Sequence, residues 1–230
     1  MRGRLDIATA YQVQLGLLDR YIEAGHRHVG WKVGLTAKAM QQQQGLDEPV
    51  LGFLLESGHR RSGVVLDCGS LIEPAFENEL CITMRATLRG PGVTRPEAHE
   101  AIGAVSPALE VVERRGDAAG DLPLAIADNV QQRAFVTGAE RGLEDSDLAA
   151  VTVEVRVNGD LVDRARGDAV LGSPELSIIW LANKLAEFGR PLEAGMRVMS
   201  GSFTRQHRVA AGDRVEARFE SFGTVTATFR

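Results

Sequence analysis

The sequence predicts an α+β protein with a largely antiparallel or mixed β-sheet. Segments with period-two alternation outnumber helical segments in the last two thirds of the chain. Most of these alternating segments are joined by short turns, as in β-hairpins. No glycine-rich phosphate loop follows a strand, so we expect no nucleotide cofactor.

Three segments carry helix signals. Residues 7–24 place apolar side chains at helical spacing, and Gly25 supplies a stop. Residues 94–97 read Thr-Arg-Pro-Glu, a capping box with proline near the first helical position, which predicts a helix through about Ala104. Ser173, followed by proline and glutamate, predicts a helix that continues to about Phe188.

Alternating segments predict the strands. Residues 151–157 alternate valine with polar residues up to Asn158 and Gly159, which predicts a hairpin with a type I′ turn. Residues 214–229 alternate around a glycine-containing turn and predict a second hairpin. Further apolar or alternating runs, interpreted as strands, cover residues 28–34, 76–84, 108–112 and 122–127.

The composition is that of an ordinary globular protein, with 44% hydrophobic and 25% charged residues among 230. A net charge of −5 and 5% aromatic residues give no basic stripe, so we expect no nucleic-acid partner. The two cysteines form no CxxC pair, which fits a reducing compartment. No apolar stretch approaches ~20 residues, so we expect no membrane segment and a cytoplasmic location.

Three glutamates stand in segments that otherwise read as buried strand. Glu77 and Glu79 are two residues apart and project from one strand face, and Glu110 interrupts the apolar run at residues 108–112. Carboxylates held this close raise each other's pKa or recruit a cation. Three carboxylates suit Mg²⁺ or Mn²⁺ better than zinc. The alternative is that Glu77 and Glu79 line a solvated sheet face while Glu110 meets an arginine.

Other residues could take part in chemistry. Lys32 lies among apolar residues and glycines, where a lowered pKa would suit a proton-transfer group; alternatively its ammonium reaches water at a strand edge. Asp128 follows the run at residues 122–127, where it could orient a ligand or cap a turn. Arg205 follows a Gly/Ser turn and could bind a substrate carboxylate, or be solvated.

The motifs together resemble a known family. In order, they are residues 30–40 (GWKVGLTAKAM), 45–49 (GLDEP), 77–79 (ENE), 107–112 (PALEVV), 127–129 (ADN), 180–184 (WLANK) and 211–213 (AGD). This series resembles the 2-hydroxypentadienoate hydratase and 4-oxalocrotonate decarboxylase group of the fumarylacetoacetate hydrolase superfamily. The resemblance spans about residues 8–229.

The resemblance implies a mixed β-sandwich roll with peripheral helices, formed by a single catalytic domain at residues 1–230. We expect a helical portion at about 1–45 and a β-roll core at about 46–230. It implies a Mg²⁺ or Mn²⁺ site at Glu77, Glu79 and Glu110, and a general acid/base Lys32 helped by Asp47. Substrate contacts would fall on Leu35, Thr36, Asp128, Gln131, Ser202 and Arg205.

The resemblance also implies a reaction. Family members act on 2-hydroxy-2,4-dienoates formed by meta-cleavage of aromatic rings, either adding water or releasing CO₂. Residues 65–72 look like the decarboxylases, whereas residues 202–205 look like 2-oxohept-4-ene-1,7-dioate hydratases, whose substrate is a dicarboxylate. We therefore predict a hydratase, with the decarboxylase and a non-catalytic metal-binding subunit as alternatives.

Two segments depart from the family pattern: residues 130–133 (VQQR), where relatives have small residues, and residues 206–208 (QHR). The bulky polar groups of residues 130–133 would reshape the substrate pocket, and residues 206–208 are unusual in the loop after Arg205. Because oligomers are common in this group, we also expect a homo-oligomer that takes a small 2-oxo or 2-hydroxydienoic acid, with a partner enzyme from the same pathway possible.

Overall fold

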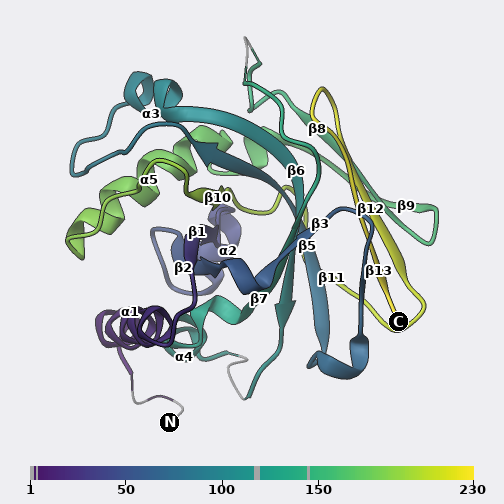
Figure 1. The fold of residues 1–230 in the computed structure, drawn as a ribbon, viewed down its shortest axis with the longest axis horizontal. Coiled ribbons are helices and arrows are strands. Elements are labelled where there is room, and N and C mark those ends of the chain that lie inside the picture. The colour runs from purple at the N-terminus through teal and green to yellow at the C-terminus, as the bar shows by residue number, and fades with distance from the viewer. Residues whose placement is uncertain (1–2, 4, 117–119, 144–145) are drawn as a thin grey trace.

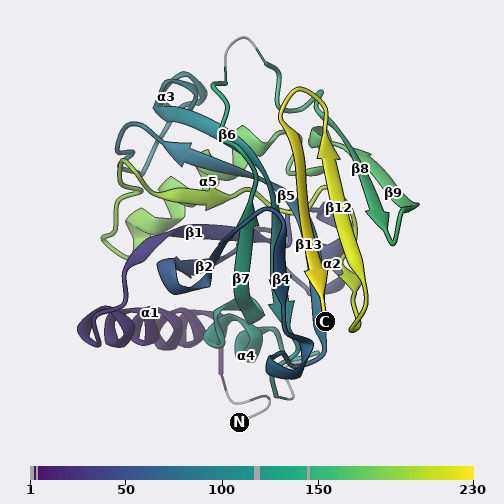
Figure 2. The ribbon, with the colours of Figure 1, turned by 45° about the vertical axis from the view of Figure 1, so that its right-hand side comes forward.

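The computed structural model describes residues 3, 5–116, 120–143 and 146–230. Two sheets form its frame (Figures 1 and 2). The larger is mixed, and its strands, in pairing order, are β2 (Val50–Leu55), β1 (His28–Gly34), β10 (Arg197–Met199), β5 (Pro74–Met84), β6 (Ile102–Glu113), β7 (Gln132–Thr137) and β3 (His59–Arg61), with β11 (His207–Arg208) beside β5. The order in the smaller sheet is β4 (Val64–Leu66), β13 (Gly223–Phe229), β12 (Arg214–Phe219), β8 (Thr152–Val157) and β9 (Asp160–Arg166).

The described residues form five helices and four short 3₁₀ turns around the sheets. Figure 1 shows α1 beside α4, and α3 above α5. The helices are α1 (Ile7–Glu23), α2 (Lys38–Gln43), α3 (Arg95–Ala101), α4 (Leu122–Ala127) and α5 (Pro174–Glu187). The 3₁₀ turns are η1 (Glu56–Gly58), η2 (Cys68–Ser70), η3 (Asn129–Gln131) and η4 (Gly167–Ala169).

Both predicted hairpins are confirmed. β8 and β9 pair through Asn158 and Gly159, whose φ angles of 55° and 91° are the positive values that a type I′ turn needs. β12 and β13 pair through the turn that contains Ser221. The smaller sheet packs against β6 and β7 of the larger one, which buries the apolar side of each hairpin.

The predicted helices form, with one boundary wrong. The capping box at α3 is present, since the backbone N–H of Thr94 donates to Glu97 Oε2 at 2.8 Å. The helix ends at Ala101 and not near Ala104, because Ile102 already pairs with Met84 of β5.

The apolar run at residues 122–127 is the helix α4, so its interpretation as a strand was wrong. The side chain of Asp121 accepts a hydrogen bond from the backbone of Leu124 at 3.1 Å, and Pro123 lies in the first turn. An N-cap aspartate and an early proline both favour a helix start.

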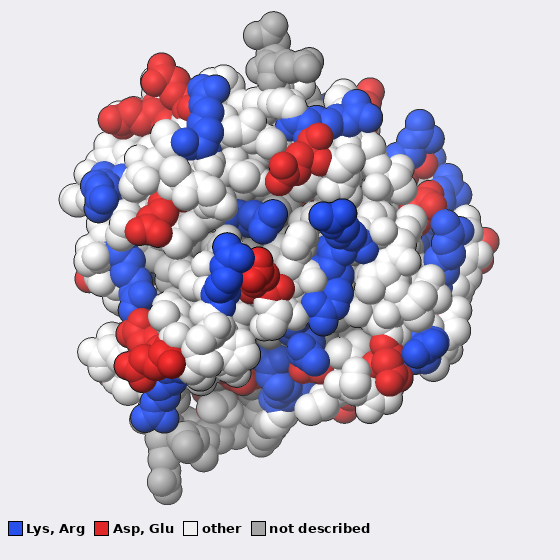
Figure 3. All heavy atoms as spheres, in the orientation of Figure 1, with Lys and Arg blue, Asp and Glu red and all other residues white. Residues whose placement is uncertain are grey.

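The N-terminal portion is not purely helical. It contributes α1 and α2, but also β1, which lies between β2 and β10 inside the larger sheet. The division near residue 45, and the single catalytic domain at residues 1–230, stay predictions. Among the described helices, none has the length and apolar character needed to cross a membrane. On the face drawn in Figure 3, basic side chains are interspersed with acidic ones.

Candidate metal centre

Three glutamates meet on adjacent strands. β5 carries Glu77 and Glu79 on one face, and β6 places Glu110 directly opposite Glu77. One carboxylate oxygen from each residue lies within 4.8 Å of the other two. Like charges opposite each other on paired strands destabilise a sheet. This arrangement therefore needs a neutralising partner.

The protein satisfies these carboxylates only in part. The backbone N–H of Gly201 donates to Glu79 Oε2 at 2.8 Å. Glu79 Oε1 and Glu110 Oε1 receive no hydrogen bond from the described residues, although both side chains are fully buried, and Glu110 Oε2 lies 3.2 Å from the ammonium of Lys32. Burial, followed by the charges of Glu110 and Glu77, raises the pKa of Glu79 well above its usual range. Buried oxygen ligands without donors fit a hard divalent cation.

Lys32 faces the same site from β1. Its Nζ lies 3.2 Å from Glu110 Oε2, and both side chains are buried. Burial tends to lower the pKa of Lys32, but the negative charges of Glu110, Glu77 and Glu79 outweigh this effect and raise it. The prediction of a lowered pKa for Lys32 is therefore wrong. Burial raises the pKa of Glu110 to about 7, against the opposing charge of Lys32.

Two glycines allow the backbone to approach the site. Gly201 has a φ of 109°, and a Cβ there would lie 2.4 Å from Thr36 Cγ2. A Cβ on Gly52 would lie 2.9 Å from Asn129 Oδ1 and 3.2 Å from Lys32 Cγ. A larger residue at either position would displace the groups that surround the glutamates.

A cavity of about 400 Å³ opens above the glutamates. Seven of the predicted site residues line it: Lys32, Leu35, Thr36, Glu77, Gln131, Ser202 and Arg205. Glu79 and Glu110 lie buried beside it. The structure therefore brings together most of the predicted site, while the roles of these residues stay predictions.

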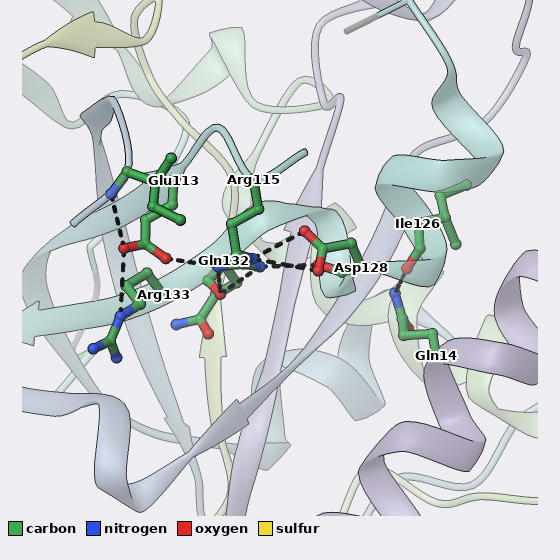
Figure 4. Close-up of polar contacts among 8 residues, drawn as sticks. Gln14, Glu113, Arg115, Ile126, Asp128, Gln132 and Arg133 are labelled. Carbon is green, nitrogen blue, oxygen red and sulfur yellow. Dashed lines mark hydrogen bonds and ion pairs between the residues drawn. The ribbon is translucent and has the colours of Figure 1, made fainter. Parts of the chain in front are cut away.

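Asp47 and Asp128 lie outside the lining of this cavity. Asp47 is exposed in the turn after α2. Asp128 ends α4 and lines a separate hollow, where Arg115 Nε donates to its carboxylate at 3.0 Å (Figure 4). Burial raises the pKa of Asp128, and the charge of Arg115 opposes the shift. The guanidinium of Arg115 also pairs with Glu113 at 3.0 Å.

A strained turn separates Asp128 from the cavity. Asn129, Val130 and Gln131 have φ angles of 56°, 49° and 60°, a left-handed conformation that is costly for a β-branched residue such as valine. The side chain of Asn129 fixes the turn by bonding both the N–H and the carbonyl of Phe53, at 2.7 and 3.0 Å. The turn places Val130 and Gln131 in the cavity wall.

The loop between β10 and β11 contributes a residue that was not among the predicted site residues. Gln206 Nε2 donates to Glu77 Oε1 at 3.3 Å and lines the cavity. Its position follows from the pairing of β11 with β5. A strand of two residues is too short to show an alternating pattern, so the sequence could not predict this pairing. The neighbouring Arg205 lies with its Nε 3.7 Å from Asp163 Oδ2, on β9 of the smaller sheet.

A curled mixed sheet that carries three glutamates and a buried lysine beside one cavity defines a candidate metal-dependent enzyme site. The family model of the fumarylacetoacetate (FAA) hydrolase C-terminal region matches residues 22–230. The chain therefore belongs to the fumarylacetoacetate hydrolase family, which confirms the predicted family and fold.

Named relatives include both predicted activities. The chain is 37% identical to a 4-oxalocrotonate decarboxylase of Pseudomonas putida over 98% of this chain and 86% of the relative. It is 34% identical to a 2-hydroxyhexa-2,4-dienoate hydratase of Comamonas testosteroni over 98% of this chain and 87% of the relative. These names fit enzymes of aromatic catabolism.

A solved structure agrees in fold. It is the 4-oxalocrotonate decarboxylase from Pseudomonas putida G7 complexed with magnesium and adipate, with a TM-score of 0.95 and 37% identity, covering 99% of this chain and 87% of that chain. A second complex of that enzyme holds calcium and acetate. Relatives of this chain therefore bind divalent cations.

Proposed function

We propose that this protein is a divalent-metal-dependent hydratase that adds water to a 2-hydroxy-2,4-dienoate, with a dicarboxylate or a substituted acid as substrate. The observation that supports it is the set of three glutamates within 4.8 Å of one another beside a buried lysine. Glu77, Glu79 and Glu110 would hold Mg²⁺ or Mn²⁺. The hydratases among the named relatives support the reaction class.

The cation, when bound, supplies Lewis-acid stabilisation of negative charge on the 2-oxygen of the substrate. Lys32 moves a proton between that oxygen and C5, which gives the α,β-unsaturated 2-oxo acid. Water then adds at C4. Lys32 suits this role because it is buried at the cavity and its Nζ lies 3.2 Å from Glu110 Oε2.

The remaining predicted residues would bind and orient the substrate. Leu35, Thr36, Gln131, Ser202 and Arg205 line the cavity around the glutamates. Asp47 keeps its proposed role as helper of Lys32, and its exposed position outside the lining makes it the residue to test first. Asp47→Asn should lower turnover if the carboxylate assists Lys32, and should leave it unchanged otherwise.

The test uses metal-free protein with added Mg²⁺ or Mn²⁺ and a set of 2-hydroxydienoates. Turnover should bleach the dienoate absorbance and yield a 4-hydroxy-2-oxo acid. Unchanged absorbance with every substrate would refute the proposal. Lys32→Ala should abolish turnover while metal binding, measured by calorimetry, remains.

The second candidate function is decarboxylation of a 4-oxalocrotonate-like acid. The 37% identity to a decarboxylase favours it. The 2-oxo group of the substrate, which takes negative charge in the hydratase reaction, would also accept the electron pair left by CO₂. One site could therefore serve either reaction. Measuring CO₂ against the hydroxy-oxo product separates them, and CO₂ release would assign the decarboxylase. If Lys32→Ala changed nothing and neither product formed, a non-catalytic metal-binding subunit would be the remaining candidate.

The oligomeric state, the cellular location and the partner of the enzyme are also proposals. We infer a homo-oligomer in the cytoplasm, with a partner enzyme of the same pathway possible. Light scattering at several protein concentrations gives the number of subunits, and a monomer at every concentration would refute the oligomer.

A further inference from the structure

The loop between β10 and β11, at residues 200–206, forms one wall of the metal cavity. Four of its residues line the cavity: Ser202, Thr204, Arg205 and Gln206. Gln206 Nε2 donates to Glu77 Oε1 at 3.3 Å, so the loop also contacts a predicted metal ligand. Both Arg205 and Gln206 are exposed, which means that packing alone does not fix this end of the loop.

Strand β5 holds the first part of the loop. The backbone N–H of Phe203 donates to the carbonyl of Asn78 at 3.0 Å, and the side chain of Asn78 donates to Thr204 Oγ1 at 2.5 Å. The ring of Phe203 also packs edge-on against Phe219 of β12, with centroids 5.2 Å apart. These contacts fix the loop as far as Thr204.

Asp163 of β9 holds the end of the loop from the smaller sheet. Asp163 pairs with Val155 of β8, whose side chain is fully buried, so the Asp163 side chain lies on the same inner face of the smaller sheet. Its Oδ1 accepts a hydrogen bond from the backbone N–H of Arg164 at 3.0 Å. Its Oδ2 lies 3.4 Å from His207 Nε2 and 3.7 Å from Arg205 Nε.

His207 makes the stronger of these two contacts. Its side chain is 10% exposed, whereas that of Arg205 is 75% exposed, and water screens a charge less where the pair is buried. The His207 ring also stacks on the buried ring of Phe76 in β5, with centroids 5.3 Å apart. Asp163 thus joins the smaller sheet to a side chain that is already fixed on the larger one.

We propose that Asp163 is a positioning residue for the metal cavity. It fixes the end of the β10–β11 loop through His207 and Arg205. Gln206 lies between these two residues in the chain, so the tether keeps its amide against Glu77. The inference rests on the proposed function, because it takes this cavity as the site of the reaction. Without the tether, the loop opens more often and Glu77 is oriented less well to hold a cation.

Hydrogen exchange reports on the loop without any substrate. The amides of Phe203 and Val209 lie on either side of the tethered end and donate to the carbonyls of Asn78 and Pro74, at 3.0 and 3.2 Å. In Asp163→Asn, which removes the charge and keeps the shape of the side chain, both amides should exchange about threefold or more faster than in the wild type. The amides of the β12–β13 hairpin should keep their rates.

Metal binding gives the second measurement. The dissociation constant of Mg²⁺, measured by calorimetry, should rise about threefold or more in Asp163→Asn, because Glu77 loses the amide that orients it. Asp163→Glu should restore part of the affinity. Asp160→Asn is the matched control, since Asp160 is an exposed aspartate on the same strand, and it should leave both measurements unchanged.

A double-mutant cycle tests the route through His207. His207→Gln should weaken Mg²⁺ binding by a similar factor, and adding Asp163→Asn to it should change the dissociation constant by less than about twofold. Fully additive effects would overturn the proposal, as would wild-type exchange rates at Phe203 and Val209 in Asp163→Asn, or faster exchange throughout the chain. A change of oligomeric state alone would also overturn it, because that result is expected if the aspartate only protects an edge strand from pairing with another chain.

The proposed function and the positioning role can fail separately. A wild type that converts no dienoate, with the expected effects on the loop and on Mg²⁺ binding, refutes the proposed function and supports the positioning role. A wild type that hydrates dienoates while Asp163→Asn behaves like Asp160→Asn supports the proposed function and overturns the positioning role.

Discussion

Replacing Glu79 by glutamine should stabilise the metal-free protein and abolish its response to metal. Glu79 is fully buried, and its carboxylate lies within 4.8 Å of those of Glu77 and Glu110. Glutamine keeps the shape of the side chain and its acceptor for the Gly201 N–H while removing the charge. A gain in stability on losing a carboxylate would show that the site is built for a cation and not for the fold.

The magnitude follows from the distances. Two unit charges 4.8 Å apart repel by about 3 kcal/mol at an effective dielectric constant of ~20. In the metal-free protein, Glu79 either stays charged and is repelled by its neighbours or takes up a proton. Glutamine carries no charge, so neither occurs. We expect a gain of about 2 kcal/mol in the unfolding free energy, or roughly 4–8 °C for a chain of this size. Wild type with Mg²⁺ at about 100 times its Kd should gain about 2.7 kcal/mol.

The assay is thermal unfolding in EDTA and in Mg²⁺. Glu79→Gln should unfold above wild type in EDTA and show no further shift with Mg²⁺. Glu175→Gln is the matched control, because Glu175 is a buried carboxylate paired with Arg95 at 3.0 Å and His99 at 2.6 Å. It should lose stability and keep the metal shift. Lower stability of Glu79→Gln in EDTA, or a retained Mg²⁺ shift, would refute the reasoning.

Three further predictions concern other parts of the chain. Burial lowers the pKa of His28 from 6.5 to about 4, so His28 gains a proton only in the unfolded chain as the pH falls between these values. The contribution of His28 to the unfolding free energy in urea should therefore fall by about 2 kcal/mol from pH 6.5 to pH 5, measured as the difference between wild type and His28→Gln. Gly201→Ala, whose Cβ would lie 2.4 Å from Thr36, should weaken Mg²⁺ binding at least about tenfold in calorimetry, whereas Gly212→Ala, with a φ of 100° but nothing within 4 Å, should leave it unchanged. Arg115→Lys should lower the unfolding free energy by about 2 kcal/mol or more, because it leaves the buried Glu113 poorly paired; a loss below about 0.5 kcal/mol would contradict this.

The sequence predicts the metal site in part because alternation is a local signal. Glu77 and Glu79 share a face by spacing alone. Their meeting with Glu110 depends on the register of β5 against β6, and a slip of one residue would have turned Glu110 to the other face. The sequence marks Glu110 as a lone carboxylate in an apolar run, and the family resemblance strengthens its assignment as the third ligand.

Long-range backbone geometry explains what the sequence did not predict. Asp128 lies next to Asn129 in the chain, yet three left-handed residues turn the backbone between Asp128 and the cavity. No pattern in residues 129–131 predicts such a turn, because valine disfavours the left-handed backbone conformation. Likewise, burial alone would lower the pKa of Lys32, and only the folded structure shows that three carboxylates reverse the shift.

The direct pairing of Glu77 with Glu110 makes one rung of the β5–β6 ladder repulsive. A cation held there would join two strands in the middle of the larger sheet, as a cross-link does, without a covalent bond. Amide hydrogen exchange near this rung should then slow as metal is added, while exchange in the β12–β13 hairpin stays the same. The concentration of free metal would thereby regulate how often the hydrogen bonds between β5 and β6 open near this pair.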